Sequence, residues 1–356
     1  MIDIVSSVGR MVKNDTNEFV FFHGTSYLGM TVNEEFHALI SIGMKLFGSN
    51  YPTSRCSNVR HELYSVFEER LAQWTGFDQA VTVSSGFLAG LLVSSLYNEF
   101  DKVYFSPNVH PALNPTYQIG TMCFSDWSKH ITQEINNNIN SKKRIVIVSN
   151  SLDSLRGEVF DFSFLQEIDD SVNLFVIIDD SHGFGILGDE GKGITSLLPQ
   201  QGNIHYAVVG SLAKAFGVIG GVILCDNNTS EKLRSSAIYS GGSAMSLAFV
   251  YAFLNANQIY KKKRKKLLEN MAYFNGLIGQ KHKLRYDERF PVYYSEAAEL
   301  YNFCLEQGIL VSSFSYPFPD SDRVTRIVIN ALHEKYDLTK LANTLDAFDE
   351  WRLHHQ

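Results

Sequence analysis

Residues 174–185 read LFVIIDDSHGFG, and a second stretch, GSLAKAFGVIGG, follows at residues 210–221. The first begins with five apolar residues, typical of a strand buried on both faces, and then continues into Asp179 and His182. The second places Lys214 among apolar and glycine residues, whereas most lysines lie on polar surfaces. Because α/β folds bind ligands just beyond the carboxyl ends of their strands, the two stretches predict a site built at strand ends.

Patterns typical of strands and helices alternate along the chain around these stretches. Apolar runs predict strands at residues 19–23, 79–83, 102–105, 144–149, 174–178, 206–209 and 221–224. Helical spacing of apolar residues predicts helices at residues 33–47, 61–75 and 86–97. Since strands that alternate with helices form mainly parallel sheets covered on both faces, we expect an α/β fold with a mainly parallel central sheet.

The C-terminal third of the chain has a different pattern. A long helix is expected at residues 244–266, followed by strands at 291–294 and 326–330 and a helix at 296–306. This succession is typical of a small α+β domain. We therefore expect an N-terminal leader (1–45) that joins the small domain, a large domain (46–250) and a small C-terminal domain (251–356).

The composition narrows the functional classes. The 356 residues are 45% hydrophobic and 19% charged, which is an ordinary globular balance. The net charge of -7 argues against nucleic acid as the main partner. Neither a membrane-spanning run nor a signal peptide is evident, so a cytoplasmic protein is expected. The four cysteines form no CxxC pair, so we expect reduced thiols and no metal site.

The polar residues at the strand ends indicate a particular chemistry. A lysine in a dry pocket loses its charge more readily, and the neutral amine of Lys214 could attack a carbonyl. Asp179 could hold a protonated ring nitrogen, although a metal site shared with His182 or a helix cap would use the same residue types. Ser211 and the turn SSGFLAG at residues 84–90 could bind a phosphate at a helix N-terminus; an ordinary tight turn is the alternative.

Three further motifs carry less weight. GFGILG at residues 183–188 matches the dinucleotide pattern GxGxxG, but it continues into GDEGKG, which predicts a turn where a helix is needed. Ser211 and Lys214 match the SxxK pattern of penicillin-binding enzymes without its companion motifs. The basic run KKKRKK at residues 261–266 could bind an anion such as the phosphates of coenzyme A, but we favour a solvated helix face.

The order of the central motifs resembles the α-oxoamine synthases. DDSHGFGILGDEGKG at residues 179–193 is followed after a short interval by GSLAKAFGVIGG, and the resemblance extends from Tyr27 to about His333. It implies the type I fold of pyridoxal-phosphate-dependent transferases and an enzyme that condenses an amino acid with an acyl-CoA or other acyl thioester, with loss of CO2. The 8-amino-7-oxononanoate synthases of biotin synthesis are the nearest members. Such enzymes usually are homodimers.

The resemblance also assigns roles to single residues. Lys214 corresponds to the lysine that carries pyridoxal 5'-phosphate as a Schiff base and later moves the substrate proton. Asp179 corresponds to the carboxylate beside the pyridine nitrogen, and His182 to a histidine near the phenolic oxygen. His110 corresponds to the residue that stacks on the pyridine ring, and Ser154 to a serine near the phenolic oxygen.

The remaining assigned residues hold charged ends of the ligands. Ser85, Gly86 and Phe87 correspond to the family's phosphate turn, and Ser211 to a further phosphate contact. Arg326, in the stretch RIVINALHE, corresponds to the arginine that holds the substrate carboxylate.

The chain also departs from the family pattern. The family's GSGGSR reads GSNYPTSR at residues 48–55, and Tyr64 stands where the family has a histidine. Ser240 or Ser243 could replace the phosphate-binding threonine that comes from the neighbouring subunit. An aminotransferase of the same fold, a 2-amino-3-ketobutyrate CoA ligase or a serine palmitoyltransferase-like enzyme are alternative functions. A non-catalytic subunit is disfavoured because Lys214 is intact.

Overall fold

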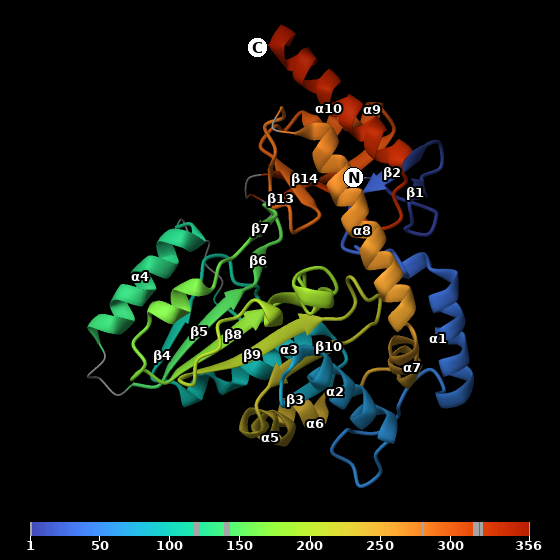
Figure 1. Ribbon diagram of the computed structural model, residues 1–356. Coiled ribbons are helices and arrows are strands. Elements are labelled where there is room, and N and C mark those ends of the chain that lie inside the picture. The colour runs from blue at the N-terminus through green and yellow to red at the C-terminus, as the bar shows by residue number, and fades with distance from the viewer. Residues whose placement is uncertain are drawn as a thin grey trace.

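Two β-sheets organise the chain, and Figure 1 shows them in the lower and upper parts of the molecule. The computed structural model describes residues 2–114, 116, 122–138, 143–279, 281–315, 320 and 323–355. The lower, central sheet has the order β3-β10-β9-β8-β5-β4. Its strands are β3 (Gln79–Val83), β4 (Lys102–Phe105), β5 (Ile145–Asn150), β8 (Leu174–Asp179), β9 (Ile204–Ser211) and β10 (Gly221–Cys225).

The central sheet is mainly parallel, as predicted. Only β10 is reversed among its strands, since it pairs antiparallel with both β3 and β9. Successive side chains of a strand point to opposite faces: in β5, Val146 and Val148 join the core on one face, whereas Ile145 and Ile147 join the core on the other. Burial on both faces explains why these strands read as continuous apolar runs.

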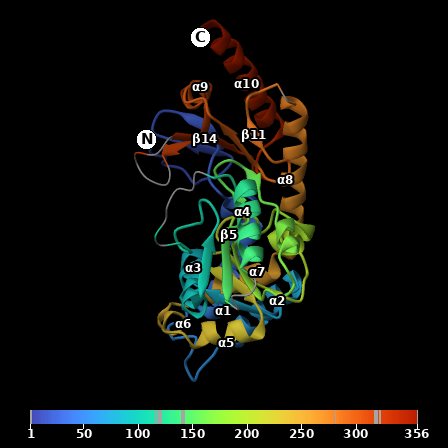
Figure 2. The same ribbon diagram turned by 90° about the vertical axis from the view of Figure 1, so that its left-hand side faces the viewer.

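Helices cover both faces of the central sheet. One face contacts α3 (Gly86–Ser94), α5 (Asn227–Ser235) and α6 (Ala237–Gly241), and the other contacts α2 (Glu62–Thr75), α4 (Phe124–Asn137) and α7 (Leu247–Asn255). Figure 2 shows α3 and α2 on opposite sides of the strands. The α/β fold class is therefore confirmed.

The upper sheet combines both ends of the chain, in the order β1-β2-β13-β14-β12-β11. Its strands are β1 (Met11–Lys13), β2 (Glu18–Phe22), β11 (Arg285–Tyr286), β12 (Val292–Ser295), β13 (Ile309–Ser315) and β14 (Arg323–Val328). The N-terminal β2 runs parallel to β13. We therefore propose the division expected from the sequence, in which the leader joins the small C-terminal domain.

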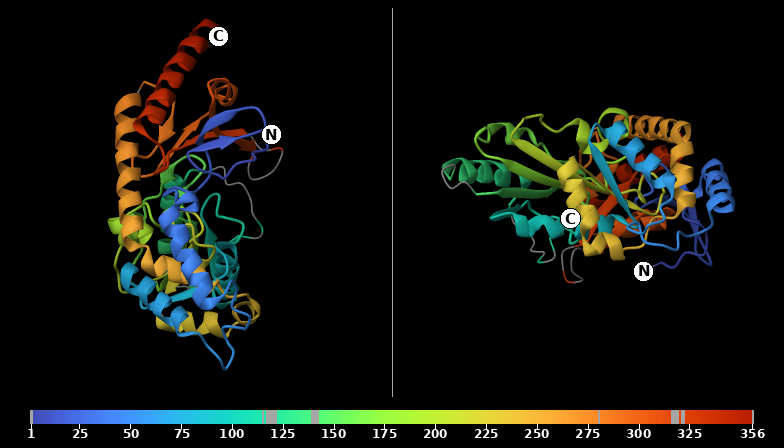
Figure 3. Two further views of the ribbon diagram at one scale, coloured as in Figure 1. Left: turned by 90° about the vertical axis from the view of Figure 1, so that its right-hand side faces the viewer. Right: turned by 90° about the horizontal axis from the view of Figure 1, so that it is seen from below.

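The remaining elements connect the two sheets or flank them. They are α1 (Glu34–Phe47), the hairpin of β6 (Leu152–Asp153) and β7 (Glu158–Val159), α8 (Asn257–Ile278), α9 (Leu300–Glu306) and α10 (Lys335–His355). Figure 3 shows α8 running along one side of the molecule, from the central domain to the small domain. In the part of the chain that the structure describes, none of the helices combines the length and the apolar character that a membrane crossing requires.

The single helix predicted at residues 244–266 is wrong, because the chain forms α7 and α8 with a break at Ala256. The side-chain amide of Asn255 binds the carbonyl of Tyr251, and the N–H of Ala256 binds the carbonyl of Phe253, three residues back. This tightens the last turn of α7 and ends it. Periodicity alone cannot reveal such a break, because apolar spacing continues through it.

His333 joins the N-terminal strand β2 to the C-terminal segment. Its ring is completely buried and stacks on Phe22 with 4.0 Å between ring centroids. Its Nε2 lies 3.0 Å from the carbonyl oxygen of Phe21, and its Nδ1 accepts the backbone N–H of Asn330. Burial lowers the pKa of His333 to about 4, so the folded protein holds this imidazole neutral.

We expect the protein to lose stability as the pH falls from 6.5 toward about 4. In that range the unfolded chain, with an ordinary histidine pKa, binds a proton that the folded protein excludes, and the loss from His333 reaches about 3 kcal/mol. Urea titrations of the wild type and His333→Gln should show a stability difference that narrows as the pH falls. A constant difference would contradict this prediction, and His354→Gln, on the exposed end of α10, is the control.

Candidate active site

A small cavity lies at the carboxyl ends of the central strands, and Phe314 and Arg326 of the upper sheet also line it. Its volume is about 220 Å³. Six of the residues singled out from the sequence line it together: His110, Ser154, Asp179, His182, Lys214 and Arg326. Three larger hollows of the molecule contain none of these six. The cavity is therefore the candidate active site.

Lys214 lies on the turn that follows β9. Its side chain is half-buried, and its neighbours Leu212, Ala215 and Phe216 are buried. Burial lowers the pKa of the Lys214 amine to about 8, although the charge of Asp179 opposes this effect. At pH 7 roughly a tenth of such an amine is neutral, far more than for a surface lysine. The amine is thus suited to react with a carbonyl.

Asp179 ends β8 at the cavity. It is in register with Asn150 of β5 and Val209 of β9, so the ends of three neighbouring strands meet there. Its Oδ1 accepts the backbone N–H of Ser181 at 2.8 Å, which orients the carboxylate. A turn and no helix follows Asp179, which argues against a helix cap, and no cluster of metal-ligating side chains occurs among the described residues.

His182 is oriented by a tyrosine that is distant in sequence. Its Nδ1 lies 2.8 Å from the hydroxyl of Tyr27, which is completely buried. Burial lowers the pKa of His182 well below its ordinary value, and the positive charges of Lys214 and Arg326 act in the same direction. His182 is therefore neutral at pH 7. When Tyr27 donates to Nδ1, the proton of the imidazole resides on Nε2.

We expect Tyr27→Phe to lower the catalytic rate about three- to tenfold, because His182 loses the hydrogen bond that fixes its ring and tautomer. Steady-state kinetics measures the rate, and the visible spectrum of the bound cofactor reports the changed surroundings of His182. Tyr293→Phe removes a buried hydroxyl that binds Asn275, away from the cavity, and is the control. Equal loss of rate in both variants would show that Tyr27 acts only through stability.

His110 is held by the side chain of the last residue of β5. Asn150 accepts the backbone N–H of His110 through Oδ1 and donates through Nδ2 to the carbonyl of Asn108. Asn108 has a positive φ of 58°, which few side chains tolerate as well as asparagine. The Nδ1 of His110 accepts the N–H of Ala112, so a neutral ring carries its proton on Nε2.

Arg326 brings the small domain to the cavity. Its side chain is only 6% exposed, and Nη1 donates to the carbonyl oxygen of Ser154 at 2.7 Å. The Nε of Arg326 is buried and has no hydrogen-bond partner among the described residues. An unpaired buried donor is costly, so the geometry favours an anionic ligand that completes this guanidinium.

The predicted phosphate turn lies beside the cavity, at the N-terminus of α3. Ser85 caps this helix by accepting a backbone N–H of its first turn. Gly86 packs so closely on the end of β9 that a Cβ there would lie 2.6 Å from the Cβ of Ser211. The ring of Phe87 meets that of His110 edge-on, with 6.3 Å between centroids. A helix N-terminus next to the cavity is suited to an anion.

The comparison with protein families decides the assignment. The sequence model of the aminotransferase class I and II family matches residues 49–345. The chain belongs to this family. Among its curated relatives, the 8-amino-7-oxononanoate synthase of Buchnera aphidicola subsp. Baizongia pistaciae is 25% identical over 350 residues, which cover 94% of this chain and 90% of that protein.

Solved structures share the fold of this aminotransferase-family chain. Serine palmitoyltransferase from S. paucimobilis, solved with bound PLP and myriocin, has a TM-score of 0.80 at 18% identity and covers 97% of this chain and 92% of its own. The 8-amino-7-oxononanoate synthase from Francisella tularensis has a TM-score of 0.74 at 20% identity and covers 96% and 100%. These two structures show the expected fold, that of the type I pyridoxal-phosphate-dependent transferases. The family match and the names of the curated relatives confirm the resemblance to the α-oxoamine synthases.

The residues of this site fit pyridoxal phosphate. The cofactor carries an aldehyde, a ring nitrogen and a phosphate. The chain offers the low-pKa amine of Lys214, the oriented carboxylate of Asp179 and the capped N-terminus of α3 around one small cavity. The unpaired Nε of Arg326 remains for an anionic group of a substrate.

Sequence reasoning missed three residues that build the site. Asn150 gave a weak signal, since it is the polar residue that ends an apolar run, as Asp179 does. Tyr27 contacts His182 across 155 positions, which no local pattern reveals. Asp180 is completely buried, accepts the N–H of Ile194, and has a pKa that burial raises to about 7. It therefore anchors the loop behind the cavity, unlike its neighbour Asp179.

Proposed function

We propose that this chain is a pyridoxal-phosphate-dependent α-oxoamine synthase that condenses a small amino acid with an acyl thioester, with loss of CO2. The observation that carries the proposal is the guanidinium of Arg326, which lines the same 220 Å³ cavity as Lys214 and whose Nε has no hydrogen-bond partner among the described residues. This guanidinium can pair with the carboxylate of an amino-acid substrate. The names of the relatives that match almost the whole chain support 8-amino-7-oxononanoate synthase as the specific activity.

Each residue of the site has its own role in the proposed reaction. When bound, pyridoxal phosphate accepts the electron pair released as a bond to the amino-acid α-carbon breaks. Asp179 would keep the ring nitrogen of the cofactor protonated, and His110 would contact the ring. Lys214 would hold the cofactor and, as a neutral amine, would then remove the α-proton of the substrate. His182, neutral and fixed by Tyr27, donates a hydrogen bond from Nε2 into the cavity.

The proposed enzyme is a cytoplasmic homodimer. Phe87 and Ile238 are 54% and 36% exposed, and both lie on helices that contact one face of the central sheet, near the phosphate turn. Exposed apolar side chains next to an anion site suit an interface with a second copy. Ser240 or Ser243, which follow Ile238 within five positions, would then contact the phosphate of the partner's cofactor. Light scattering of the purified protein tests the dimer.

The reaction itself is tested by mixing the purified holoenzyme with pimeloyl-CoA and single amino acids, and following the free thiol of coenzyme A. We expect thiol release and CO2 formation with alanine, or with glycine or serine if another member of the group is correct. The alternative is an aminotransferase. Transfer of the amino group to a keto acid without thiol release would establish that alternative and overturn the proposal.

A further inference from the structure

A second hollow lies behind the turns that carry the active-site residues. It has a volume of about 790 Å³ and shares no lining residue with the active-site cavity. Its lining includes Leu28, Gly185 and Phe216. Each of the three lies within three residues, along the chain, of a residue of the active site: Tyr27, His182 and Lys214 respectively. A ligand in the hollow would thus lie next to the segments that support the site.

One wall of the hollow is aromatic. Trp74 of α2 meets Phe216 edge-on at 5.8 Å between centroids, and Phe216 meets Phe253 and Tyr260 in the same manner at 5.2 and 5.1 Å. Phe216 and Tyr260 are buried, whereas Trp74 is partly exposed. The wall therefore offers an indole that a flat ring can contact, held on a fixed aromatic base.

The other walls carry an excess of positive charge. Five cationic side chains line the hollow against the two carboxylates of Glu190 and Glu269. The cations come from α2, the turn after Gly188, and α8: Arg70, Lys192, Lys261, Arg264 and Lys265. This local excess is opposite in sign to the net charge of -7 of the whole chain. Cations from three elements that converge on one hollow favour an anion with several charges.

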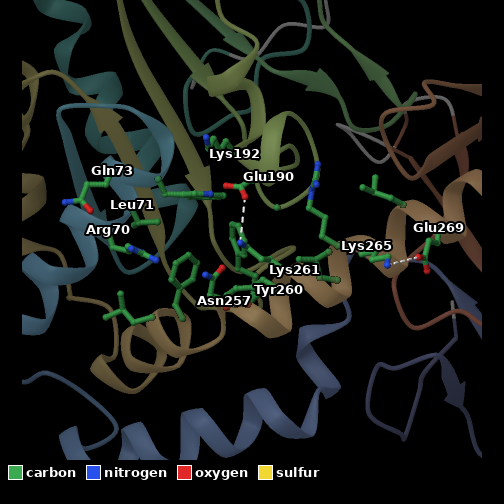
Figure 4. Close-up of a pocket in the computed structure, with 18 residues that line it drawn as sticks. Arg70, Leu71, Gln73, Glu190, Lys192, Asn257, Tyr260, Lys261, Lys265 and Glu269 are labelled. Atoms are coloured by element: carbon green, nitrogen blue, oxygen red, sulfur yellow. Dashed lines mark hydrogen bonds and ion pairs between the residues drawn. The ribbon is translucent and has the colours of Figure 1, made fainter.

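The basic run of α8 divides into two faces. Lys261, Arg264 and Lys265 line the hollow, at positions i, i+3 and i+4 of one helix face, whereas Lys262 and Lys263 do not line it. Figure 4 shows Lys261 and Lys265 on α8, with Glu190 directed toward Lys261. The interpretation of the run as a solvated face thus holds for only part of it.

Two ion pairs between lining residues of the hollow are weak. Lys261 lies 3.8 Å from Glu190, and Lys265 lies 3.9 Å from Glu269; all four side chains are more than half exposed. Exposed pairs of this kind contribute little to stability, so an anion can replace the carboxylates. Arg264, in contrast, donates to the carbonyls of Ile186 and Gly188, and so holds the loop that follows His182.

We propose that this hollow is an effector site for a nucleotide-like polyanion. An aromatic base would stack on Trp74, because every base offers a flat face. Its phosphates would contact Arg70, Lys261 and Lys265, since charge-assisted hydrogen bonds from lysine and arginine are strong. Binding there changes the loop held by Arg264 and, through it, the position of His182. The inference does not depend on which reaction the enzyme catalyses.

The experiment measures binding of ADP to the purified holoenzyme by calorimetry and by quenching of tryptophan fluorescence. Adenosine and inorganic diphosphate are the part-ligands. ADP is expected to bind at least about tenfold more tightly than either, because it uses both walls. The quenching should disappear in Trp74→Phe, while Trp127 and Trp351 remain. Equal affinity for ADP and diphosphate would overturn the aromatic part of the proposal.

Charge variants separate this site from any other. The double change Lys261→Glu and Lys265→Glu should weaken ADP binding about tenfold or more. The matched control is Lys262→Glu with Lys263→Glu, which makes the same change of charge on the same helix. It should alter the affinity for ADP less than about twofold. Glu190→Gln removes a competitor for Lys261 and should tighten binding about twofold to threefold. Equal weakening by both double variants, or none by either, would overturn the proposal.

The link to the active site has its own measurement. Saturating ADP should shift the visible spectrum of the bound cofactor in the wild type and in the control double variant. The shift should be absent at the same ADP concentration in the Lys261→Glu and Lys265→Glu protein. ADP binding without a spectral shift would refute the effector role.

Discussion

Lys214→Ala is expected to yield a colourless protein that no longer attaches pyridoxal phosphate covalently, with a rate at least about 10³-fold below that of the wild type. Lys214 supplies the only amine that lines the active-site cavity among the described residues. Its pKa of about 8 makes it both the attachment point and the base, so one substitution removes two functions. Borohydride reduction followed by peptide mass analysis measures the attachment, and product formation measures the rate.

A small amine provides the decisive control for Lys214→Ala. Methylamine can enter the space that the lost side chain leaves, and it should restore part of the rate in proportion to its neutral form. Lys283→Ala, on an exposed loop, should retain full colour and rate. A yellow, active Lys214→Ala protein would contradict the proposed role of Lys214. A variant that methylamine does not rescue would point to lost structure as the cause.

Sequence patterns were sufficient to predict which site residues lie at the ends of strands. Asp179 and Lys214 follow apolar runs whose period identifies buried strands, and parallel strands place their carboxyl ends at one edge of a sheet. That Asp179 and Lys214 line one cavity with His110 therefore follows from patterns that are local in the chain, whereas the arrival of Arg326 from the upper sheet does not. Their chemical roles remain predictions, because geometry alone does not report a reaction.

Three features could not be predicted from the sequence patterns. The bond from Tyr27 to His182 joins the leader to the central sheet, and the break at Ala256 depends on how Asn255 satisfies a single carbonyl. The sequence does not show which residues of the basic run line the hollow, because this depends on the rotation of α8 about its axis relative to Trp74. The Tyr27–His182 bond and the orientation of α8 depend on tertiary packing, which local patterns do not report. The break at Ala256 is local, but apolar periodicity does not report the hydrogen bonds that end α7.

Arg326→Leu is expected to raise the KM for the amino-acid substrate about 100-fold, since the substrate carboxylate loses a charge-assisted partner worth about 3 kcal/mol. The KM of Arg326→Lys should lie between those of the wild type and Arg326→Leu, because an ammonium group keeps the charge but cannot form the paired hydrogen bonds of a guanidinium. Steady-state kinetics at varied amino-acid concentration measures both. Arg323→Leu, on the same strand β14 but exposed, is the matched control and should leave the KM unchanged.

The stability of the same variant separates binding from folding. Arg326 is buried, and its Nε has no partner in the part of the chain that the structure describes, so in the free protein its charge is desolvated without full compensation. We therefore expect Arg326→Leu to unfold at the same or a higher urea concentration than the wild type, even though it binds substrate poorly. A residue that served mainly to hold the small domain to Ser154 would behave in the opposite way, with stability lost and KM retained. Such a result would show that the guanidinium is structural and would remove the main support for a carboxylate-binding active site.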